Sequence, residues 1–154
     1  MIEIGKMREG EATALGRVMW DAIHNTPGAY TQAERNAWCA APAAGPKWVA
    51  RLASQTVWVA RRGVEPCAFV TLADQGYVDF TYVHSSAQGL GLFRRLIAAL
   101  ETEACNAGAP RIWTHASLIA QPAFAALGFH VIHHETVVRG DQMLKRAEME
   151  KPLQ

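Results

Sequence analysis

One long amphipathic segment, residues 89–106, constrains the fold more than any other part of the chain. Its apolar side chains recur at helical spacing, and its charged side chains lie off their stripe. The stripe consists of Leu92, Phe93, Leu96, Ile97, Leu100 and Ala104. Strand-like segments flank this helix, residues 77–83 before it and residues 111–115 after it. A helix that joins two strands over this length predicts a crossover between parallel neighbours in one sheet.

The rest of the chain completes a mixed α/β pattern. Runs rich in β-branched and aromatic residues predict strands, and apolar residues at helical spacing predict helices. Thr31-Gln32-Ala33-Glu34 has the pattern of a capping box. The expected strands are residues 2–4, 56–60, 67–72, 77–83, 111–115, 130–138 and 142–150, and the expected helices are residues 9–24, 31–38, 47–54, 89–106 and 121–127. We therefore predict one α/β domain over residues 1–154, with about six to seven mostly antiparallel strands and helices on both faces.

Composition and charge narrow the classes of function. Half of the 154 residues are apolar, and the formal net charge of +1 gives no global field for nucleic acid or an anionic membrane. No apolar run approaches the ~20 residues that span a bilayer, and the first six residues do not resemble a signal peptide. Cys39, Cys67 and Cys105 are widely spaced, which argues against a disulfide framework and a zinc cluster. We expect a cytoplasmic protein with no membrane or nucleic-acid partner and no metal.

The segment that carries chemistry is the loop between the strand at residues 77–83 and the long helix. It contains Gln88-Gly89-Leu90-Gly91 directly before the apolar stripe begins. The first amides of a helix lack partners and carry partial positive charge, and glycines let the backbone approach a ligand closely. Such a loop can bind a phosphate or pyrophosphate. Alone, Gly-x-Gly is equally compatible with a tight turn, because Arg94 excludes the dinucleotide fingerprint and no phosphate-loop motif is present.

Two segments resemble the GNAT superfamily of acyl-CoA-dependent N-acetyltransferases. The first is Tyr82-Val83-His84 followed by Gln88-Gly89-Leu90-Gly91-Leu92, which is similar to the family's acetyl-CoA loop. The second is Thr114-His115-Ala116-Ser117 followed by Phe124-Ala125-Ala126-Leu127-Gly128-Phe129, which is similar to its fifth strand, next helix and closing Gly-Phe. The resemblance implies a GNAT-like sheet whose fourth and fifth strands splay apart to admit the cofactor arm.

The resemblance also implies roles for individual residues. The backbone amides of Gln88, Gly89, Leu90, Gly91, Leu92 and Phe93 would hold the CoA pyrophosphate, Val83 would face the pantetheine arm and thioester, and Ser117 stands near the family's frequent cofactor-contacting Asn. Two positions depart from the pattern. Ser86 occupies the usual Gln or Arg position, and Phe124 replaces the family's frequent tyrosine acid, so the phenyl ring has no proton for the leaving thiolate.

Asp79 and Tyr82 are the candidate catalytic base and acid, since both lie on the strand that leads into the loop. Their opposite parity on a regular strand predicts that only one points into the cleft, unless a bulge intervenes. His84 and His115 are reserve candidates, because histidine titrates near neutral pH. Trp20, Tyr30 and Trp38 lie where GNAT proteins commonly build the acceptor pocket, and an aromatic wall would suit an apolar or cationic acceptor. The same three residues are also compatible with a simple core role.

We therefore expect an N-acetyltransferase that moves an acetyl group from acetyl-CoA to a primary amine by direct attack in a ternary complex. Two alternatives stay open: a non-catalytic acyl-CoA-binding module, which Phe124 favours, and an interaction domain whose Gly-x-Gly is only a turn. The acceptor class is equally open among antibiotics, polyamines, amino acids, peptides and protein termini. A homodimer is a common arrangement for this fold.

Overall fold

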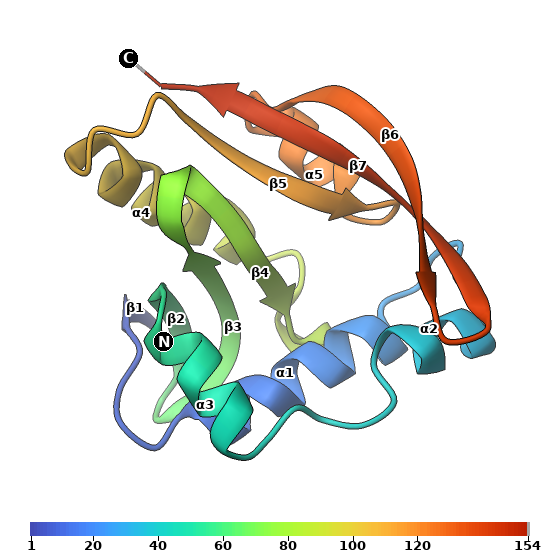
Figure 1. Ribbon diagram of the computed structural model, residues 1–154. Coiled ribbons are helices and arrows are strands. Elements are labelled where there is room, and N and C mark those ends of the chain that lie inside the picture. Colours follow the sequence, from blue (N-terminus) through green and yellow to red (C-terminus); the bar gives the residue numbers. More distant parts are fainter. Residues whose placement is uncertain (154) are drawn as a thin grey trace.

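A seven-stranded sheet forms the centre of the protein, with the strand order β1-β2-β3-β4-β5-β7-β6 (Figure 1). The computed structural model describes residues 1–153. The strands are β1 (Ile2–Lys6), β2 (Thr56–Arg62), β3 (Glu65–Leu72), β4 (Tyr77–Val83), β5 (Arg111–Ser117), β6 (His130–Arg139) and β7 (Gln142–Pro152). Every neighbouring pair is antiparallel except β4 and β5, which are parallel. The predicted mixed, mostly antiparallel sheet is confirmed.

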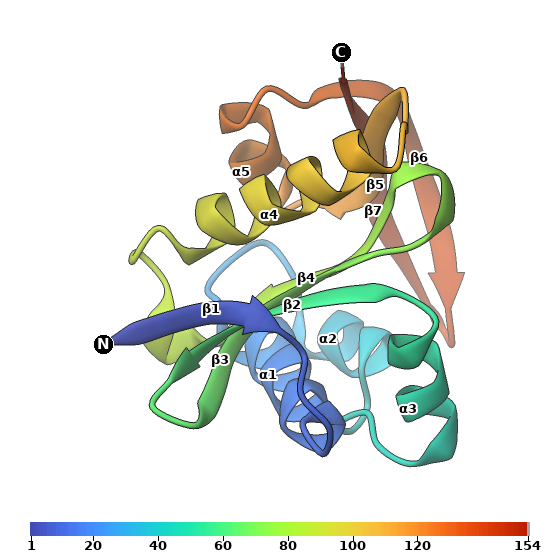
Figure 2. The ribbon, with the colours of Figure 1, turned by 90° about the vertical axis from the view of Figure 1, so that its left-hand side faces the viewer.

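Helices cover both faces of the sheet (Figure 2). They are α1 (Ala12–Asn25), α2 (Gln32–Trp38), α3 (Pro46–Ala53), α4 (Leu92–Asn106) and α5 (Gln121–Ala126), with single 3-10 turns η1 (Asp74–Gly76) and η2 (Ser85–Ala87). Helices α4 and α5 enclose one apolar core against the sheet, and α1, α2 and α3 enclose a second core on the opposite face. None of the helices in residues 1–153 combines the length and apolarity needed to cross a bilayer.

The helix starts follow local sequence chemistry. The predicted capping box is present at α2, where Thr31 Oγ1 accepts from the Glu34 amide and the Glu34 carboxylate accepts from the Thr31 amide. Helix α4 begins at Leu92, three residues later than predicted. The reason is that Gly89 and Gly91 have φ values of 80° and 75°, a left-handed conformation that an α-helix does not contain. The glycines therefore form the loop itself rather than the first helical turn.

Strands β4 and β5 pair over a short stretch and then separate. Their register includes only Tyr77 with Trp113 and Val78 with Thr114. Beyond these two pairs, the last five residues of β4 have no pairing with β5 in the described chain. The predicted splay between the fourth and fifth strands is therefore confirmed, and it opens the sheet beside the loop that leads into α4 (Figure 1).

A bulge interrupts the regular alternation of β4. Val70 of β3 pairs with Thr81 and Leu72 pairs with Val78, so β4 has one residue more than β3 between these pairs. Val78 packs into the α4 core, whereas Phe80 packs into the α1 core. Regular alternation predicts opposite sides for Asp79 and Tyr82, but the bulge that this prediction left open is present, and Asp79, Phe80 and Tyr82 line the same cavity. The Phe80 amide donates to the buried Thr71 Oγ1 at 2.9 Å, which satisfies a donor at the irregular position.

A buried ion pair fastens β2 to the turn before α1. Arg61 is 1% exposed, and its Nε and Nη2 atoms donate to the two carboxylate oxygens of Glu11. Its Nη2 atom also donates to the Lys6 carbonyl at 2.7 Å. The hydrogen bonds from Arg61 are the main reason that the pKa of Glu11 lies below its ordinary value, although burial opposes them.

Candidate active site

A first cavity of about 280 Å³ occupies the splay between β4 and β5. Its walls come from α1, the end of α2, the end of β4, the glycine loop, the first turn of α4 and the segment from the end of β5 into α5. Seven of the eight predicted cofactor-binding residues line it: Val83, Gln88, Gly89, Gly91, Leu92, Phe93 and Ser117. Leu90 does not line it, and its side chain is 52% exposed. The structure therefore brings the predicted loop, strand end and Ser117 together around one space.

The glycine loop presents a run of free backbone donors. The Ala87 amide donates to His84, and the Arg95 amide donates to Gly91. Between them, the amides of residues 88–94 have no hydrogen-bond acceptor within residues 1–153, and no side chain caps α4. These unpaired donors sit at the positive end of a 15-residue helix, an arrangement that suits a phosphate group.

Side chains from α1 hold this loop in place. The Asp21 carboxylate accepts from the Ser85 amide at 2.6 Å and the Ser85 hydroxyl at 3.1 Å, and it lies 3.4 Å from His84 Nε2. Burial pushes the pKa of Asp21 up, but hydrogen bonds from Ser85 and Asn25 outweigh it and leave the pKa below its ordinary value. Gln88 Nε2 adds a second tie by donating to Thr26 Oγ1 at 2.7 Å. Sequence reasoning missed Asp21, although an acidic residue beside the apolar stripe of α1 was a usable signal.

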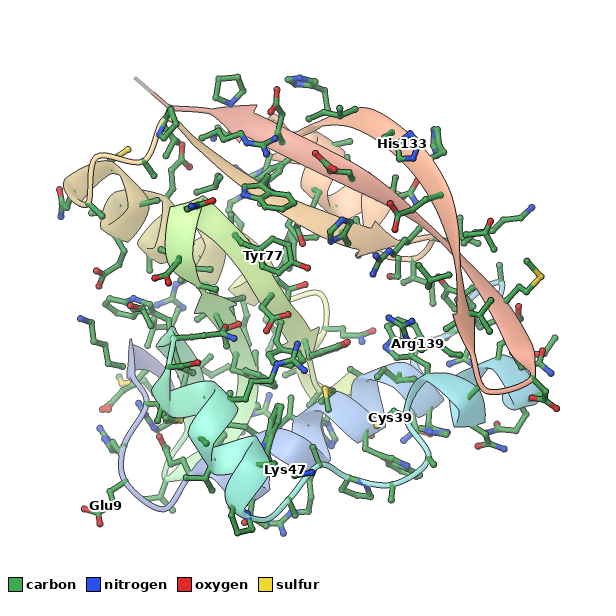
Figure 3. The ribbon with its side chains drawn as sticks, in the orientation of Figure 1. Glu9, Cys39, Lys47, Tyr77, His133 and Arg139 are labelled. Atoms are coloured by element: carbon green, nitrogen blue, oxygen red, sulfur yellow. The ribbon has the colours of Figure 1, made fainter. Side chains whose placement is uncertain are left out.

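A second cavity of about 220 Å³ lies beside the first, between β4 and the β6–β7 hairpin. Aromatic and charged side chains dominate its lining, among them Tyr30, Trp38, Arg51, Tyr77, Asp79, Phe80, Tyr82, His115, Arg139, Lys145 and Arg146. Figure 3 shows Tyr77 and Arg139 reaching toward this space from β4 and β6. Three residues, Trp38, Tyr82 and Ser117, line both cavities. The two cavities therefore meet at these side chains.

Asp79 lies in the second cavity, but its carboxylate is already engaged. Arg51 Nη2 donates to both carboxylate oxygens at 3.0–3.1 Å, and Gln55 Nε2 donates to Oδ2 at 2.7 Å. The Arg51 guanidinium also lies 4.5 Å from the centroid of the Phe80 ring. Oδ2 thus accepts three hydrogen bonds, whereas Oδ1 accepts one.

Comparison with known proteins places this architecture in a family. A model described as an acetyltransferase (GNAT) domain matches residues 29–151. The chain belongs to the GNAT family. A search of the curated proteins finds no match. Among solved structures, a GCN5-related N-acetyltransferase from Rhodopseudomonas palustris aligns with a TM-score of 0.92 and 27% identity, covering 98% of this chain and 95% of the other.

Two more distant solved structures share the GNAT fold. A putative acetyltransferase from Salmonella typhimurium, solved with acetyl-CoA, aligns with a TM-score of 0.72 and 19% identity, covering 100% of this chain and 95% of that one. An N-acetyltransferase from Thermoplasma acidophilum, solved with coenzyme A, aligns with a TM-score of 0.74 and 16% identity over 99% of each chain.

Within this GNAT fold, the position of the frequent tyrosine acid belongs to the core. Phe124 is 1% exposed and lines neither cavity. Its ring packs edge-on against Phe93 at 5.0 Å and against Phe129 at 4.9 Å between centroids. Phe124 therefore stabilises the packing of α4 and α5 and supplies no proton.

Two other groups that can exchange protons face the second cavity of the GNAT domain. Burial raises the pKa of Tyr82 far above its ordinary value, so its phenol remains protonated at neutral pH. His115 Nδ1 lies 2.9 Å from the Tyr77 hydroxyl, and burial, followed by the charge of Arg146, lowers the pKa of His115 below 6.5. At neutral pH the site thus combines a protonated phenol with an uncharged imidazole.

The remaining candidates divide between cavity and core. Tyr30 and Trp38 line the second cavity, as the predicted acceptor wall requires, and the Tyr30 hydroxyl also accepts from the Leu118 amide at 2.7 Å. Trp20 lines neither cavity and stacks on His24 with 4.4 Å between ring centroids. The reserve histidine His84 likewise lines neither cavity. Its Nδ1 atom accepts a hydrogen bond from the Ser86 amide at 3.1 Å.

Proposed function

We propose that this GNAT protein transfers an acetyl group from acetyl-CoA to a primary amine by direct attack in a ternary complex. The observation that carries the proposal is the meeting of two cavities at Trp38, Tyr82 and Ser117. One cavity ends at a row of free backbone donors, and the other is lined by groups that can exchange protons. Such a pair allows two substrates to approach one another from different sides without a covalent enzyme intermediate.

The chain's own groups suit the CoA moiety. The free amides of residues 88–94 match a pyrophosphate, which needs several donors and a positive helix end. The pantetheine arm is a largely apolar chain that contains amide groups. It can lie between β4 and β5 where the two strands are no longer paired. This placement puts the thioester near Tyr82 and Ser117, where the cavities join. The solved relatives named with acetyl-CoA or coenzyme A support this choice of donor.

His115 is our proposed general base. A primary alkyl amine is mostly protonated at pH 7 and must lose a proton before it attacks. When Nδ1 of His115 donates to the Tyr77 hydroxyl, Nε2 is left with a free lone pair, and His115 lines the second cavity. Asp79 remains the alternative base, but the donors from Arg51 and Gln55 occupy its oxygens. A positioned base contributes about 10²–10⁴-fold to the rate.

Tyr82 is our proposed general acid. The ammonium form of the acceptor first releases one proton to solvent. The neutral amine then attacks the thioester carbonyl, the C–N bond forms as the C–S bond breaks, the electron pair leaves on the CoA sulfur, and the second amine proton passes to His115. The thiolate then takes the phenol proton of Tyr82, which lies at the junction of the cavities, and the phenolate regains a proton from the protonated His115 through solvent. This assignment fills the role that Phe124 leaves empty.

The competing candidate is a non-catalytic acyl-CoA-binding module of the same fold. The core position of Phe124 favours it, because the frequent tyrosine acid is absent. Both candidates bind acetyl-CoA, and they differ in turnover alone.

Two measurements test the proposal in sequence. Acetyl-CoA at 100 times its Kd should stabilise the protein by about 2.7 kcal/mol, which is visible as a rise in melting temperature. Release of free CoA thiol is then followed over a panel of primary amines. Absence of any thermal shift at millimolar acetyl-CoA rules out both candidates, and a clear shift without amine-dependent thiol release favours the binding module.

A further inference from the structure

Positive charge dominates the lining of the second cavity. Four cationic residues line it, together with a single carboxylate, that of Asp79. Two of the guanidinium groups are neutralised by carboxylates: Arg51 pairs with Asp79 at 3.0 Å and Arg146 pairs with Glu135 at 2.6 Å. The other two cations are Arg139 and Lys145, and neither has a carboxylate within ion-pair distance in residues 1–153. The cavity therefore carries uncompensated positive charge.

Strand register identifies Arg139 as the unpaired cation that faces the cavity. Glu135 is opposite Arg146, Val137 is opposite Leu144 and Arg139 is opposite Gln142 in the β6–β7 ladder. Directly opposite residues share a face, and alternate residues of a strand share a face. Val137, Leu144 and Arg146 line the cavity, so Arg139 lies on their face and the side chain of Lys145 lies on the other.

The guanidinium of Arg139 has spare binding capacity. Its one hydrogen bond within the described chain is from Nη1 to the Val138 carbonyl at 3.1 Å. A guanidinium has five N–H donors in a planar fork, which matches the two oxygens of a carboxylate. Figure 3 shows the side chain directed toward the space between β4 and the β6–β7 hairpin. The acceptor cavity thus has an oxyanion-binding group opposite the β4 wall.

One aromatic ring that lines the second cavity already has a cationic partner. The Phe80 ring already has the Arg51 guanidinium at 4.5 Å, so its cation-binding face is taken. A polyamine would enter a cavity of its own charge sign, which costs free energy. The unpaired positive charge also favours the neutral form of an amine bound nearby, and the neutral amine is the nucleophile.

We infer that the acceptor is a primary amine that also carries a carboxylate or similar oxyanion, an amino-acid-like molecule whose anionic group binds Arg139. This inference rests on the proposed function and specifies the substrate class of its acceptor site. Tyr30, Trp38 and Tyr77 then contact the body of the acceptor, and Arg139 orients its amine toward the junction at Tyr82.

Matched acceptors test the charge requirement. L-phenylalanine, L-leucine and L-alanine are each compared with their carboxamides, which differ only in the anionic group, and spermidine serves as the cationic competitor. Binding is measured by thermal shift in the presence of CoA, and turnover by thiol release. We expect each free acid to bind and react at least about tenfold better than its amide, since a hydrogen bond to a charged group is involved. An aminophosphonate analogue of phenylalanine distinguishes a carboxylate-specific site from a general oxyanion site.

A pair of variants tests the residue. Arg139→Gln should raise the KM of the preferred acid about tenfold and leave the amide and acetyl-CoA unaffected. The control is Arg62→Gln, an exposed arginine on β2 that lines neither cavity, and it should behave as the unmodified protein. Equal preference for acid and amide, better use of spermidine, or an unchanged acid-to-amide ratio in Arg139→Gln would overturn the inference.

The readouts separate failure of this inference from failure of the proposed function. Acetyl-CoA binding with turnover of amides or spermidine, but not acids, refutes the acceptor class and leaves the transferase intact. Absence of acetyl-CoA binding refutes the transferase. In that case the acceptor class is tested by thermal shift alone. If none of the free amino acids stabilises the protein, the proposed acceptor class is refuted as well.

Discussion

The two glycines that bound α4 allow the cofactor loop to be tested against an internal control. Gly91 precedes the helix with φ 75° and Gly108 follows it with φ 76°, and a Cβ added at either position meets no atom within 4 Å. Replacement of either by Ala places an L side chain in the left-handed region, which costs about 1–2 kcal/mol. For a chain of this size each kcal/mol lowers the melting temperature by about 2–4 °C. Gly91→Ala and Gly108→Ala should therefore destabilise the protein to a similar extent.

Only Gly91 should affect the cofactor. Gly91 lines the first cavity and lies within the run of free amides, whereas Gly108 lies at the far end of the same helix. A Cβ at Gly91 would enter the space that we propose for the pyrophosphate. Loss of one hydrogen bond to a charged group, worth about 1.5–3 kcal/mol, lowers affinity about tenfold to 100-fold. Titration calorimetry with CoA measures this directly. Equal CoA affinities in the two variants would refute the assignment of this loop to the pyrophosphate.

Three further predictions concern the proton-transfer groups and the buried ion pair. Tyr82→Phe should lower kcat by about 10²-fold and change the KM for acetyl-CoA little; an unaltered kcat excludes Tyr82 as the acid. Because the pKa of His115 lies below 6.5, kcat at saturating acceptor should fall with an apparent pKa below 6.5, and His115→Gln should abolish that fall along with most activity. Glu11→Gln strands the buried Arg61 and should cost about 3–5 kcal/mol of unfolding free energy at pH 7 by denaturant titration. Since the pKa of Glu11 is lowered from 4.5, the pair stabilises the protein above pH 4.5 and this contribution is lost as pH falls through the folded-state pKa, a loss that Glu11→Gln should not show.

Features determined by local pattern could be predicted from the sequence. The capping box at Thr31, the strand at Tyr77–Val83 and the C-terminal end of α4 at Asn106 all depend on residues close together in the chain. The splay between β4 and β5 came from the family resemblance, and the register confirms it.

Features determined by contacts between distant segments could not be predicted. The partners of Asp79 are Arg51 of α3 and Gln55, which follows the C-terminal cap of α3, and they lie 28 and 24 positions away in sequence. The hydrogen bond from the Ser85 amide to Asp21 spans 64 positions. The face of Asp79 relative to Tyr82 depends on the pairing register with β3, which strand alternation alone does not reveal. The charge of the acceptor cavity was missed for a similar reason, since Arg51, Arg139 and Arg146 come together only when β6 and β7 are folded beside β4.

The irregular pairing of β4 also sets how many functional side chains one short strand can offer. A regular pleat sends alternate residues to opposite faces, so four consecutive residues give two side chains to each. From Asp79 to Tyr82, three of the four residues (Asp79, Phe80 and Tyr82) line the second cavity. A carboxylate, a phenyl ring and a phenol therefore share one wall because β4 has one extra residue opposite β3. Thr71 lies on β3, which lines neither cavity, and its hydroxyl accepts a hydrogen bond from the Phe80 amide. This hydrogen bond satisfies the backbone donor at the position where the strand pairing is irregular.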